Sequence, residues 1–562
     1  MQNEKRLPNA LSGSAGRIYL CILGFFSVIY LVWRIGWTLP TYHRAIDIVF
    51  GVLLLLAELM GAFEMVIHYA LEIKRKPCPE TPSWTPGTQP DVDVLVPTRG
   101  EPVSVVEKTL RGCLSMEYPK GNVNIYLCDD AANEELHTLC EELGVRYLAR
   151  EEHKDAKAGN LNYGLEHSSS PLVVVFDADM CPKPEFLLRT VPFFLGGREK
   201  GKSKQSARNL DEGVGFVQTP QDFRDADLFQ RAFRAEEDLP NEQDFFYLEL
   251  EPARNSCNAV IFGGSNTLLS RKALEDVGGF STGTLTEDFA TGIEIEKKGY
   301  RCIAIDTPLA SGLSPDNLRS MIRQRSRWAR GCIQAGDNAH LITSKGLGLM
   351  QRLSYLSAVT YWYAPIKRLV YLMAPLMFPV FGITVINCDF SNMLLFWLPM
   401  YLLASLGIRL FSGGLRSAKW SEIYEVCLCP FLLPGVIAET IGFSKVDFAV
   451  TDKSGKGGWR SWYPLPHLCL IALSVWGIVN TVQRLYWERT SIYLLLLFWL
   501  VFNLYELLYA LVFVLSCRKL PPVREREKRL RRYHLRGAWR MSLLSIIIRI
   551  FRDTEKKEEK VA

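Results

Sequence analysis

The sequence predicts an α/β domain inserted into a bundle of transmembrane helices. Of the 562 residues 48% are hydrophobic, and they are concentrated in long apolar runs near both ends of the chain. Between these runs, short β-like stretches alternate with helical patterns, as in α/β domains. A proline-rich segment, residues 77–90, separates the first two apolar runs from the central region and predicts a stiff, extended linker.

Six apolar runs are long enough to cross a bilayer, which requires about 20 mostly apolar residues. We therefore expect about six transmembrane helices, two before the α/β domain and four after it. The first run lacks a small-residue cleavage site, so it predicts an anchor and not a signal peptide. The runs are 18–37, 47–71, 368–388, 393–411, 465–482 and 491–517.

Lysine and arginine placement predicts the orientation in the membrane. Basic residues precede the first run and follow the second, whereas the short connections 387–392 and 486–490 carry few. We therefore expect both termini and the α/β domain on the cytoplasmic side of the plasma or inner membrane. The basic residues are Lys5, Arg6, Arg17, Lys74, Arg75 and Lys76.

The C-terminal tail, residues 518–562, is strongly basic. It holds 15 Lys and Arg against 6 Asp and Glu, whereas the net charge of the whole chain is +5. This composition predicts contact with anionic lipid and not with nucleic acid. Segments 420–443 and 539–551 predict amphipathic helices lying along the membrane interface. The 14 cysteines are scattered, so neither a zinc site nor structural disulfides are expected.

Five β-like runs define the central domain, and each run ends in polar residues. In open α/β sheets ligands lie outside the carboxyl ends of the strands, so these polar residues should share one crevice. The runs are 91–96, 123–127, 172–176, 213–217 and about 258–262. The predicted division of the chain is 1–76 with two membrane helices, 77–90 as linker, 91–345 as the α/β domain, 346–517 as the second membrane region, and 518–562 as the tail.

Acidic side chains at the predicted strand ends suit a metal-bound diphosphate. Asp177 and Asp179 follow a Val-Val-Val-Phe run and can reach one divalent cation. Asp129 and Asp130 end the preceding strand in the same way. Asp288 falls in the first turn of a predicted helix, where a carboxylate either stabilises the helix start or acts as a general base. Taken singly, each motif also fits loop aspartates that cap a helix.

Lys157 and the segment 324–328 (QRSRW) supply matching positive charge. Small residues beside Lys157 permit the close approach of a phosphate. In 324–328, guanidinium groups match phosphate oxygens and the indole offers a flat face to a sugar ring. Alone, this segment also fits a basic cluster facing lipid head groups. Together with the acidic motifs it indicates glycosyl transfer from a nucleotide sugar.

Several motifs in the same order resemble those of the processive family-2 glycosyltransferases, most closely the bacterial cellulose synthases. The resemblance implies a GT-A-like (Rossmann-like) catalytic domain, inverting glycosyl transfer, and membrane helices that form a channel for the growing polymer. It runs from about residue 92 to 331 and resumes in the membrane region. The motifs are 97–102 (PTRGEP), 156–165 (AKAGNLNYGL), 176–179 (FDAD), 216–220 (FVQTP), 264–266 (GSN), 286–288 (TED), 324–328 (QRSRW) and 448–453 (FAVTDK).

The resemblance also implies a role for each matching residue. Asp288 would be the catalytic base, and Asp179 with Asp177 would bind a divalent cation, Mg²⁺ or Mn²⁺. Trp328 would stack on the acceptor sugar. The remaining roles are UDP-sugar binding by Thr98, Glu101, Asp129, Asp130, Lys157, Asp177, Gln218, Gln324 and Arg327, acceptor binding by Gly263, Ser265 and Asn266, and a gating loop with Phe448, Val450, Thr451 and Lys453 that closes over the nucleotide.

The sequence departs from the family pattern at several positions. Arg99 stands where an aromatic contact to the base is usual, and Ala131 replaces the glycine of DDG. Gly263 replaces a common cysteine and Asp452 a usual proline, both near the expected substrates, so the product linkage stays open. Only 45 residues follow Cys517, too few for the β-barrel that binds cyclic di-GMP, so no control by that nucleotide is expected.

We expect a β-glucan synthase that uses UDP-glucose, with cellulose, β-1,3-glucan and mixed-linkage β-1,3/1,4-glucan as open products. The alternatives are a chitin- or hyaluronan-type synthase using another UDP-sugar, a transferase acting on a lipid carrier, and an inactive export channel. Segment 324–328 and the gating loop disfavour the lipid carrier, and the intact acidic motifs disfavour inactivity. Expected partners are UDP-glucose, the growing glucan, the lipid bilayer and an accessory envelope subunit, without nucleic acid.

Overall fold

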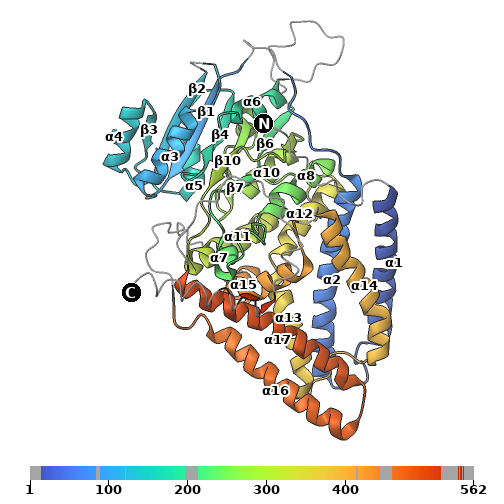
Figure 1. Cartoon of the computed structure of the whole chain (residues 1–562). Helices are drawn as coiled ribbons and strands as arrows, with labels where there is room; N and C mark the ends of the chain where they lie inside the picture. Colours follow the sequence, from blue (N-terminus) through green and yellow to red (C-terminus); the bar gives the residue numbers. More distant parts are fainter. Residues whose placement is uncertain are drawn as a thin grey trace, which may run out of the picture.

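The computed structural model places an α/β domain at one end of a bundle of long helices (Figure 1). The helices of the bundle come from both ends of the chain, so the α/β domain is inserted between them as the sequence predicts. The structure describes residues 14–83, 89–119, 122–195, 213–412, 415–443 and 459–520, together with residues 542, 543, 545, 546 and 549.

A seven-stranded mixed sheet forms the centre of the α/β domain, in the order β3-β2-β1-β4-β8-β6-β9. Neighbouring strands are parallel except β8, which is antiparallel to β4 and β6. The chain moves outward from β1 to β3 and then returns to β4 beside β1, which opens a crevice at their carboxyl ends. The strands are β1 (Val92–Thr98), β2 (Val123–Asp129), β3 (Arg146–Ala149), β4 (Leu172–Val175), β6 (Val214–Gln218), β8 (Thr267–Ser270) and β9 (Arg301–Ala304).

Both faces of this sheet are covered, which explains its nearly continuous apolar strands. Side chains alternate between the faces: Val94 packs with residues of α3, α4 and α6, whereas Leu95 packs with residues of α5, α9 and α10. These helices are α3 (Val103–Leu114), α4 (Glu134–Leu143), α5 (Ala156–Glu166), α6 (Phe186–Thr190), α9 (Arg271–Asp276) and α10 (Glu287–Lys297). A small second sheet contains β5 (Cys181–Pro182), β10 (Ala310–Gly312) and β7 (Gln221–Phe223).

One predicted strand is wrong. Residues 258–262 form no strand, and the strand of this region is β8, which begins at Thr267. The apolar side chains are buried, but carboxylates take the place of a neighbouring strand: the Val260 amide donates to Glu296 Oε1 and the Ile261 amide to Glu251 Oε2, both at 2.9 Å. Carboxylate side chains, and not a neighbouring strand, therefore bind the backbone amides of this segment.

Among the described residues, seven helices are long and apolar enough to cross a membrane. Six coincide with the predicted runs. The seventh, α15, occupies the segment expected to lie along the interface, and by length and composition it is also a candidate span. The seven are α1 (Ser14–Trp37), α2 (Ala45–Lys74), α13 (Ala364–Phe381), α14 (Phe390–Phe411), α15 (Ala418–Thr440), α16 (Leu465–Glu488) and α17 (Ile492–Ser516).

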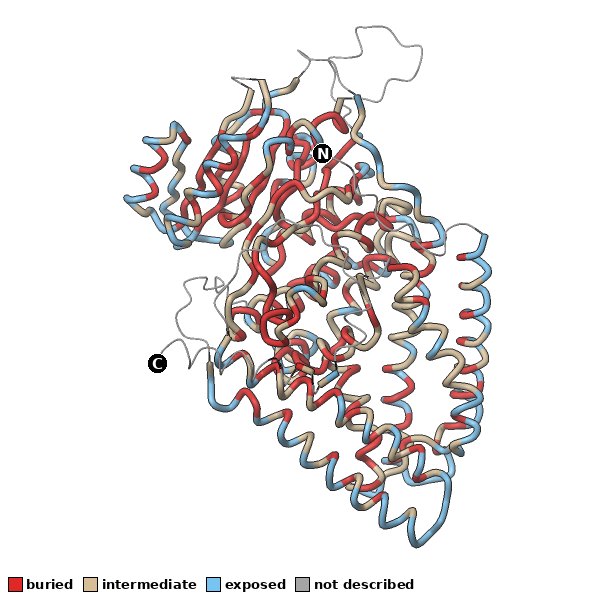
Figure 2. Tube along the Cα trace, viewed as in Figure 1, coloured by how far each residue is buried: buried red, intermediate tan, exposed pale blue. Residues whose placement is uncertain are grey.

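The outer faces of the bundle are exposed and apolar, as lipid contact requires. Figure 2 shows exposed residues along α1 and α16, and these include Phe25 and Val28 of α1 and Trp476 of α16. The acidic residues that interrupt the second apolar run face inward instead. Glu58 pairs with Arg34 (2.8 Å) and Glu64 pairs with Lys367 of α13 (2.7 Å). Each inward carboxylate is therefore compensated by a cation.

Several further helices connect the α/β domain to the bundle. Phe229 of α7 stacks on Phe513 of α17, with ring centroids 4.5 Å apart. In the tail, the described Ile546 is buried in the apolar cluster that contains Phe229 and Phe513. Arg549 Nη1 donates to Asp238 Oδ2 (2.7 Å), so both tail residues contact protein. The remaining helices are α7 (Leu228–Phe233), the π-helix η3 (Phe246–Leu250), α8 (Glu251–Arg254), α11 (Leu318–Asn338) and α12 (Leu349–Tyr361), and the 3₁₀ turns are η1 (Val191–Phe194), η4 (Asn255–Cys257) and η5 (Cys517–Lys519).

Candidate active site

A cleft of about 150 Å³ lies at the carboxyl ends of β1 and β4. Its walls come from the end of β1, the start of α5, the residues after β4, the start of α10 and the middle of α11. Most of the residues singled out in the sequence meet here, although they span more than 200 positions. Those that line the cleft are Thr98, Glu101, Asp130, Lys157, Asp177, Asp179, Gly263, Asp288, Gln324, Arg327 and Trp328.

The two carboxylates that follow β4 suit a magnesium-like cation. The Asp177 amide donates to Ser265 Oγ (2.8 Å), and Asp179 Oδ2 accepts from the Leu313 amide (3.2 Å), so the turn is held at both residues. Within the described part of the chain, no group of three or more His, Cys, Asp or Glu side chains suits a metal ion. A pair of carboxylates fits Mg²⁺, because that ion keeps its other positions for water and phosphate oxygens.

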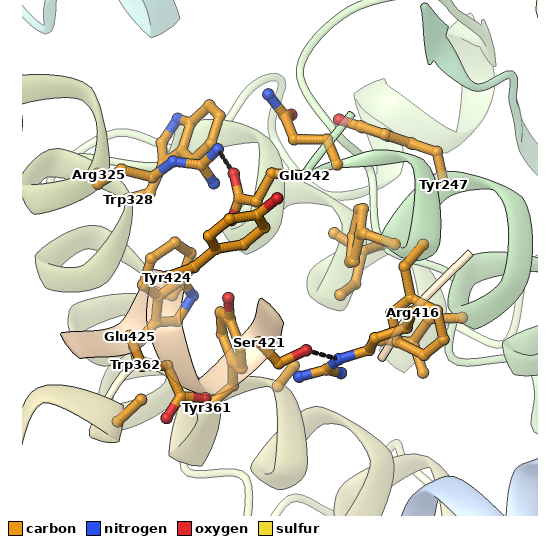
Figure 3. A pocket seen from close by; sticks show the side chains of 18 of the residues that line it. Glu242, Tyr247, Arg325, Trp328, Tyr361, Trp362, Arg416, Ser421, Tyr424 and Glu425 are labelled. Atoms are coloured by element: carbon orange, nitrogen blue, oxygen red, sulfur yellow. Dashed lines mark hydrogen bonds and ion pairs between the residues drawn. The ribbon is translucent and has the colours of Figure 1, made fainter. Parts of the chain in front are cut away.

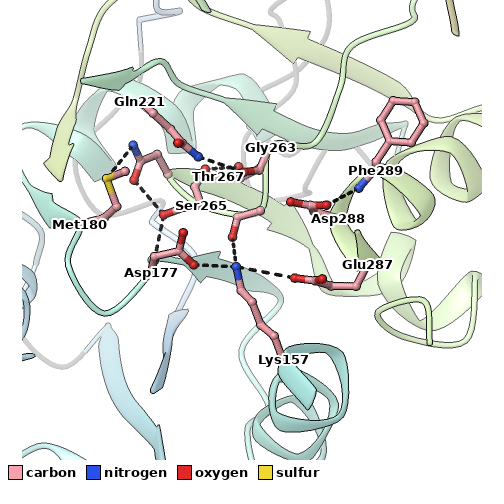
Figure 4. A network of polar contacts seen from close by, with 12 residues as sticks. Lys157, Asp177, Met180, Gln221, Gly263, Ser265, Thr267, Glu287, Asp288 and Phe289 are labelled. Atoms are coloured by element: carbon pink, nitrogen blue, oxygen red, sulfur yellow. Dashed lines mark hydrogen bonds and ion pairs between the residues drawn. The ribbon is translucent and has the colours of Figure 1, made fainter. Parts of the chain in front are cut away.

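Figure 4 shows Lys157 in a polar network with Asp177 and Glu287. Its Nζ donates to Asp177 Oδ1 (2.6 Å) and to the Gly264 carbonyl (2.8 Å), and it lies 3.7 Å from Glu287 Oε1. Burial alone would lower the pKa of Lys157, but the charges of Asp177, Glu287 and Asp288 outweigh it and raise that pKa. Lys157 is therefore a fixed positive charge in the cleft.

Asp288 lies in the first turn of α10, as predicted. Its Oδ1 accepts from the Phe289 amide (2.7 Å), which orients the carboxylate at the start of the helix. Burial raises the pKa of the Asp288 carboxyl well above its usual range, the charge of Glu287 raises it further, and Lys157 opposes both. A carboxylate whose pKa is raised toward neutrality is suited to accept a proton from a hydroxyl group.

We expect this shift to appear in the pH dependence of activity. A base must be ionised, so kcat/KM should fall as the pH decreases through the raised pKa of Asp288. Glu287→Gln removes a neighbouring negative charge and makes Asp288 easier to ionise, so it should move the acid limb to lower pH. The measurement is kcat/KM between pH 5 and 8 for both proteins. An acid limb unchanged by Glu287→Gln would contradict the assignment.

The absence of a side chain at Gly264 leaves space for the Asp288 carboxylate. A Cβ on Gly264 would lie 2.2 Å from Asp288 Oδ2, and the backbone there has φ +77°. We expect Gly264→Ala to lower activity at least about 100-fold, because the carboxylate must move, and to destabilise the fold by roughly 1–2 kcal/mol through backbone strain. The measurements are kcat and the unfolding free energy.

Gly278→Ala is the matched control. Gly278 has a similar φ, +85°, but a Cβ there meets nothing within 4 Å. It should cost a similar unfolding free energy and leave kcat nearly unchanged. Equal losses of kcat in the two variants would show that strain, and not contact with Asp288, causes the effect.

On α11, the helical repeat separates the two arginines of segment 324–328. Gln324, Arg327 and Trp328 face the cleft, as residues three and four positions apart share one face of a helix. Arg325 points elsewhere: it forms an ion pair with Glu242, and its Cζ lies 4.7 Å from the centroid of the Trp328 ring. Only one guanidinium of the segment therefore faces the cleft, and the other supports the indole.

One end of the cleft is formed by the loops that follow β1 and β2. Thr98 Oγ1 and the Arg99 amide both donate to Glu101 Oε2, at 2.7 Å each. Asp130 binds the guanidinium of Arg150 with both oxygens, and its amide donates to the Thr98 carbonyl (3.0 Å). These contacts fix the two loops side by side. The predicted uridine contacts stay predictions.

Asp129 does not line the cleft, unlike its neighbour. Its two oxygens accept from the Ala131 and Asn133 amides, at 2.8 Å each, and from the Tyr147 hydroxyl (2.9 Å). The side chain is buried and shapes the turn after β2. In this structure Asp130 is therefore the better placed of the two for a ligand.

Gln218, Ser265 and Asn266 lie beneath the cleft and hold its floor. Gln218 Oε1 accepts from the Gly263 amide (2.8 Å), and Ser265 Oγ donates to Asn266 Oδ1 (3.0 Å). All three are buried, so the structure places them as supports of the residues that face the cleft. The gating-loop residues Phe448, Val450, Thr451 and Lys453 lie outside the described part of the chain.

A second cavity, of about 370 Å³, adjoins the cleft on the side of the bundle. Gly263, Asp288 and Trp328 line both cavities, so the two meet beside the candidate base. Figure 3 shows rings and polar groups around this cavity, including the Glu242–Arg325 ion pair. Its labelled lining residues include Tyr247, Tyr361, Trp362, Arg416, Ser421, Tyr424 and Glu425.

Sequence reasoning missed three residues of the site. Glu287 lies next to Asp288 in the same motif, and its position beside Lys157 requires the fold. Arg150 and Gln221 carry no motif of their own. Arg150 pairs with Asp130, and Gln221 Nε2 donates to the Gly263 carbonyl (2.9 Å). Only spatial pairing across the cleft identifies them.

Comparison with known proteins agrees with these features. Residues 90–331 match the family described as glycosyltransferase like family 2, and residues 260–426 match the family cellulose synthase. The cellulose synthase 1 catalytic subunit [UDP-forming] of Komagataeibacter xylinus is 34% identical over 445 residues, 78% of this chain and 57% of that protein. The cellulose synthase catalytic subunit [UDP-forming] of Pseudomonas fluorescens (strain SBW25) is 30% identical over 503 residues, 88% of this chain and 66% of that protein.

A third relative, cellulose synthase 2 of Novacetimonas hansenii, is 32% identical over 494 residues, 85% of this chain and 30% of that protein. The chain thus spans less than two thirds of the length of each of these relatives. The α/β domain, with its mixed sheet, has the GT-A-like fold. The chain belongs to the family-2 glycosyltransferases and is related within them to the catalytic subunits of bacterial cellulose synthases.

Proposed function

We propose that this chain is a membrane-embedded, inverting glycosyltransferase that polymerises a β-glucan from UDP-glucose. The observation that carries the proposal is the junction of the two cavities at Asp288 and Trp328. Charged groups suited to a nucleotide diphosphate line the smaller cavity. Aromatic rings suited to sugars line the larger one, which leads toward the membrane helices.

Lys157, Gln324 and Arg327 are placed to bind the diphosphate of the donor. Lys157 supplies a fixed positive charge, and the guanidinium of Arg327 matches phosphate oxygens. Asp177 and Asp179 would hold a divalent cation, Mg²⁺ or Mn²⁺. When bound, that cation neutralises charge that develops on the leaving diphosphate.

In the proposed reaction, Asp288 takes the proton from one hydroxyl of the acceptor sugar. The oxygen of that hydroxyl attacks the anomeric carbon of glucose, and the bond from this carbon to the diphosphate breaks. UDP leaves from the opposite face, so the configuration inverts. Trp328 stacks on the acceptor ring and holds its hydroxyl near Asp288.

The larger cavity then takes up the growing chain. Rings of Tyr361, Trp362 and Tyr424 line it, and sugar rings stack on such faces. We propose that the polymer leaves through the bundle, with the α/β domain on the cytoplasmic side of the inner membrane. Because Gly263 replaces a cysteine that is common in the family, the candidate products are glucans with β-1,4, β-1,3 or mixed β-1,3/1,4 linkages.

The experiment is polymer synthesis by the purified full chain in lipid vesicles. UDP-[¹⁴C]glucose should be incorporated into a polymer that a β-glucanase degrades, with UDP released in equal amount. Separate digestion by enzymes specific for β-1,4 and β-1,3 bonds assigns the linkage. Incorporation from UDP-N-acetylglucosamine alone would reject the glucan assignment, and release of UDP without polymer would reject polymerisation.

A further inference from the structure

A chain of hydrogen bonds connects the end of α15 with the loop that precedes Asp288. Gln334 Nε2, on α11, donates to Glu439 Oε1, on α15 (2.8 Å). Gln334 Oε1 accepts from the amide of Leu285 (3.1 Å), three positions before Asp288. The second carboxylate oxygen of Glu439 accepts from Arg330 Nε (3.1 Å). One amide side chain thus joins a membrane-region helix to the candidate catalytic loop.

Two glycines bring these three elements into close contact. A Cβ on Gly331 of α11 would lie 2.6–2.7 Å from atoms of Thr286, the residue that precedes α10. A Cβ on Gly435 of α15 would lie 2.9 Å from Ser326 Oγ of α11. Because interiors this tightly packed transmit displacements, a shift of α15 or α11 reaches the start of α10.

Glu439 is an unfavourable residue at its position unless it serves this contact. It is the penultimate residue of α15, where the helix dipole disfavours a negative charge. Its side chain is only 8% exposed, and a buried carboxylate is costly without partners. Both of its carboxylate oxygens accept hydrogen bonds, one from Gln334 and one from Arg330.

We propose that Glu439 and Gln334 are positioning residues for Asp288, an inference that rests on the proposed function. Glu439 fixes the amide orientation of Gln334, so that its oxygen faces the Leu285 amide. The Leu285 amide in turn fixes the loop from which α10 and Asp288 start. A displacement of about 1 Å at a catalytic group costs on the order of 100-fold in rate, so losing this link should lower kcat.

A reciprocal exchange tests the link. Gln334→Glu alone places two carboxylates against each other without a donor, and we expect kcat to fall about 10-fold or more, with KM for UDP-glucose nearly unchanged. Combining Gln334→Glu with Glu439→Gln restores one donor and one acceptor, and should recover kcat to within about 3-fold. Glu107→Gln, which removes an exposed ion pair with Arg111, is the control and should leave kcat unchanged.

Full kcat in Gln334→Glu, or no recovery in the double variant, would overturn the proposal. Amide hydrogen exchange of the peptide that contains Leu285 provides a readout independent of activity. Exchange there should accelerate in Glu439→Ala, whereas unchanged exchange would contradict the link. If the unmutated protein forms no polymer from any UDP-sugar, the proposed function fails, and hydrogen exchange still decides on the link.

Discussion

Replacing Asp288 by asparagine should lower kcat for polymer synthesis about 1,000-fold, within the range that a general base contributes. Asparagine is nearly isosteric and keeps an oxygen that can accept from the Phe289 amide, so the start of α10 should stay intact. It cannot take the proton of the acceptor hydroxyl. The measurements are kcat and binding of UDP, and the affinity for UDP should change little.

Asp276→Asn, on α9 outside the cleft, is the control for removal of one carboxylate from the same domain. It should leave kcat within a factor of about two, as expected for a site without a catalytic contact. Polymer synthesis retained in Asp288→Asn would exclude Asp288 as the base. Glu287, which lines the same cleft, would then be the next candidate for the base.

Removing divalent cations should abolish polymer synthesis. Asp177 and Asp179 supply two carboxylates, too few for a tight site formed by protein alone, so the cation should bind together with UDP-glucose. EDTA should therefore stop the reaction, and added Mg²⁺ or Mn²⁺ should restore it. Asp179→Ala should lower kcat at least about 100-fold and weaken the cation dependence of UDP binding.

Isothermal titration of UDP with and without Mg²⁺ gives a readout of this site besides turnover. In the unmutated protein the cation should tighten UDP binding, and in Asp179→Ala that gain should disappear. Glu185→Ala, an acid just beyond the second motif carboxylate and absent from the cleft lining, is the control. Turnover undiminished by EDTA would contradict the role of both carboxylates.

The sheet was largely predictable from its buried strands, because a strand covered on both faces reads as a continuous apolar run. The 172–176 and 213–217 runs are examples. The run 258–262 looked the same, yet Glu251 and Glu296 bind its amides in place of a partner strand. Hydrophobicity reports burial and cannot tell which group accepts a backbone hydrogen bond.

The site was predictable where chemistry requires a residue type at a strand or helix end. Asp177, Asp179 and Asp288 lie in the cleft for that reason. The sequence did not show which of two adjacent carboxylates faces the cleft, because successive side chains at a strand end point in different directions. Asp129 shapes a turn, whereas Asp130 lines the cleft.

Partners distant in the sequence were not predictable at all. Arg150 reaches Asp130 across 20 residues, and Glu439 reaches Gln334 across 105. Each pair forms because the tertiary fold brings two elements together, and neither Arg150 nor Glu439 belongs to a motif. Such supports decide how well a predicted catalytic residue is placed.

In the proposed function, the cleft makes the polymer and the adjoining cavity passes it through the bundle. A direct test uses sealed vesicles in which the α/β domain faces outward and which are supplied with UDP-[¹⁴C]glucose. β-1,4- and β-1,3-glucanases are added together, first to the intact vesicles and then after detergent. We predict labelled polymer that resists the enzymes until detergent opens the vesicles. Complete digestion of the polymer in intact vesicles would contradict its passage through the bundle.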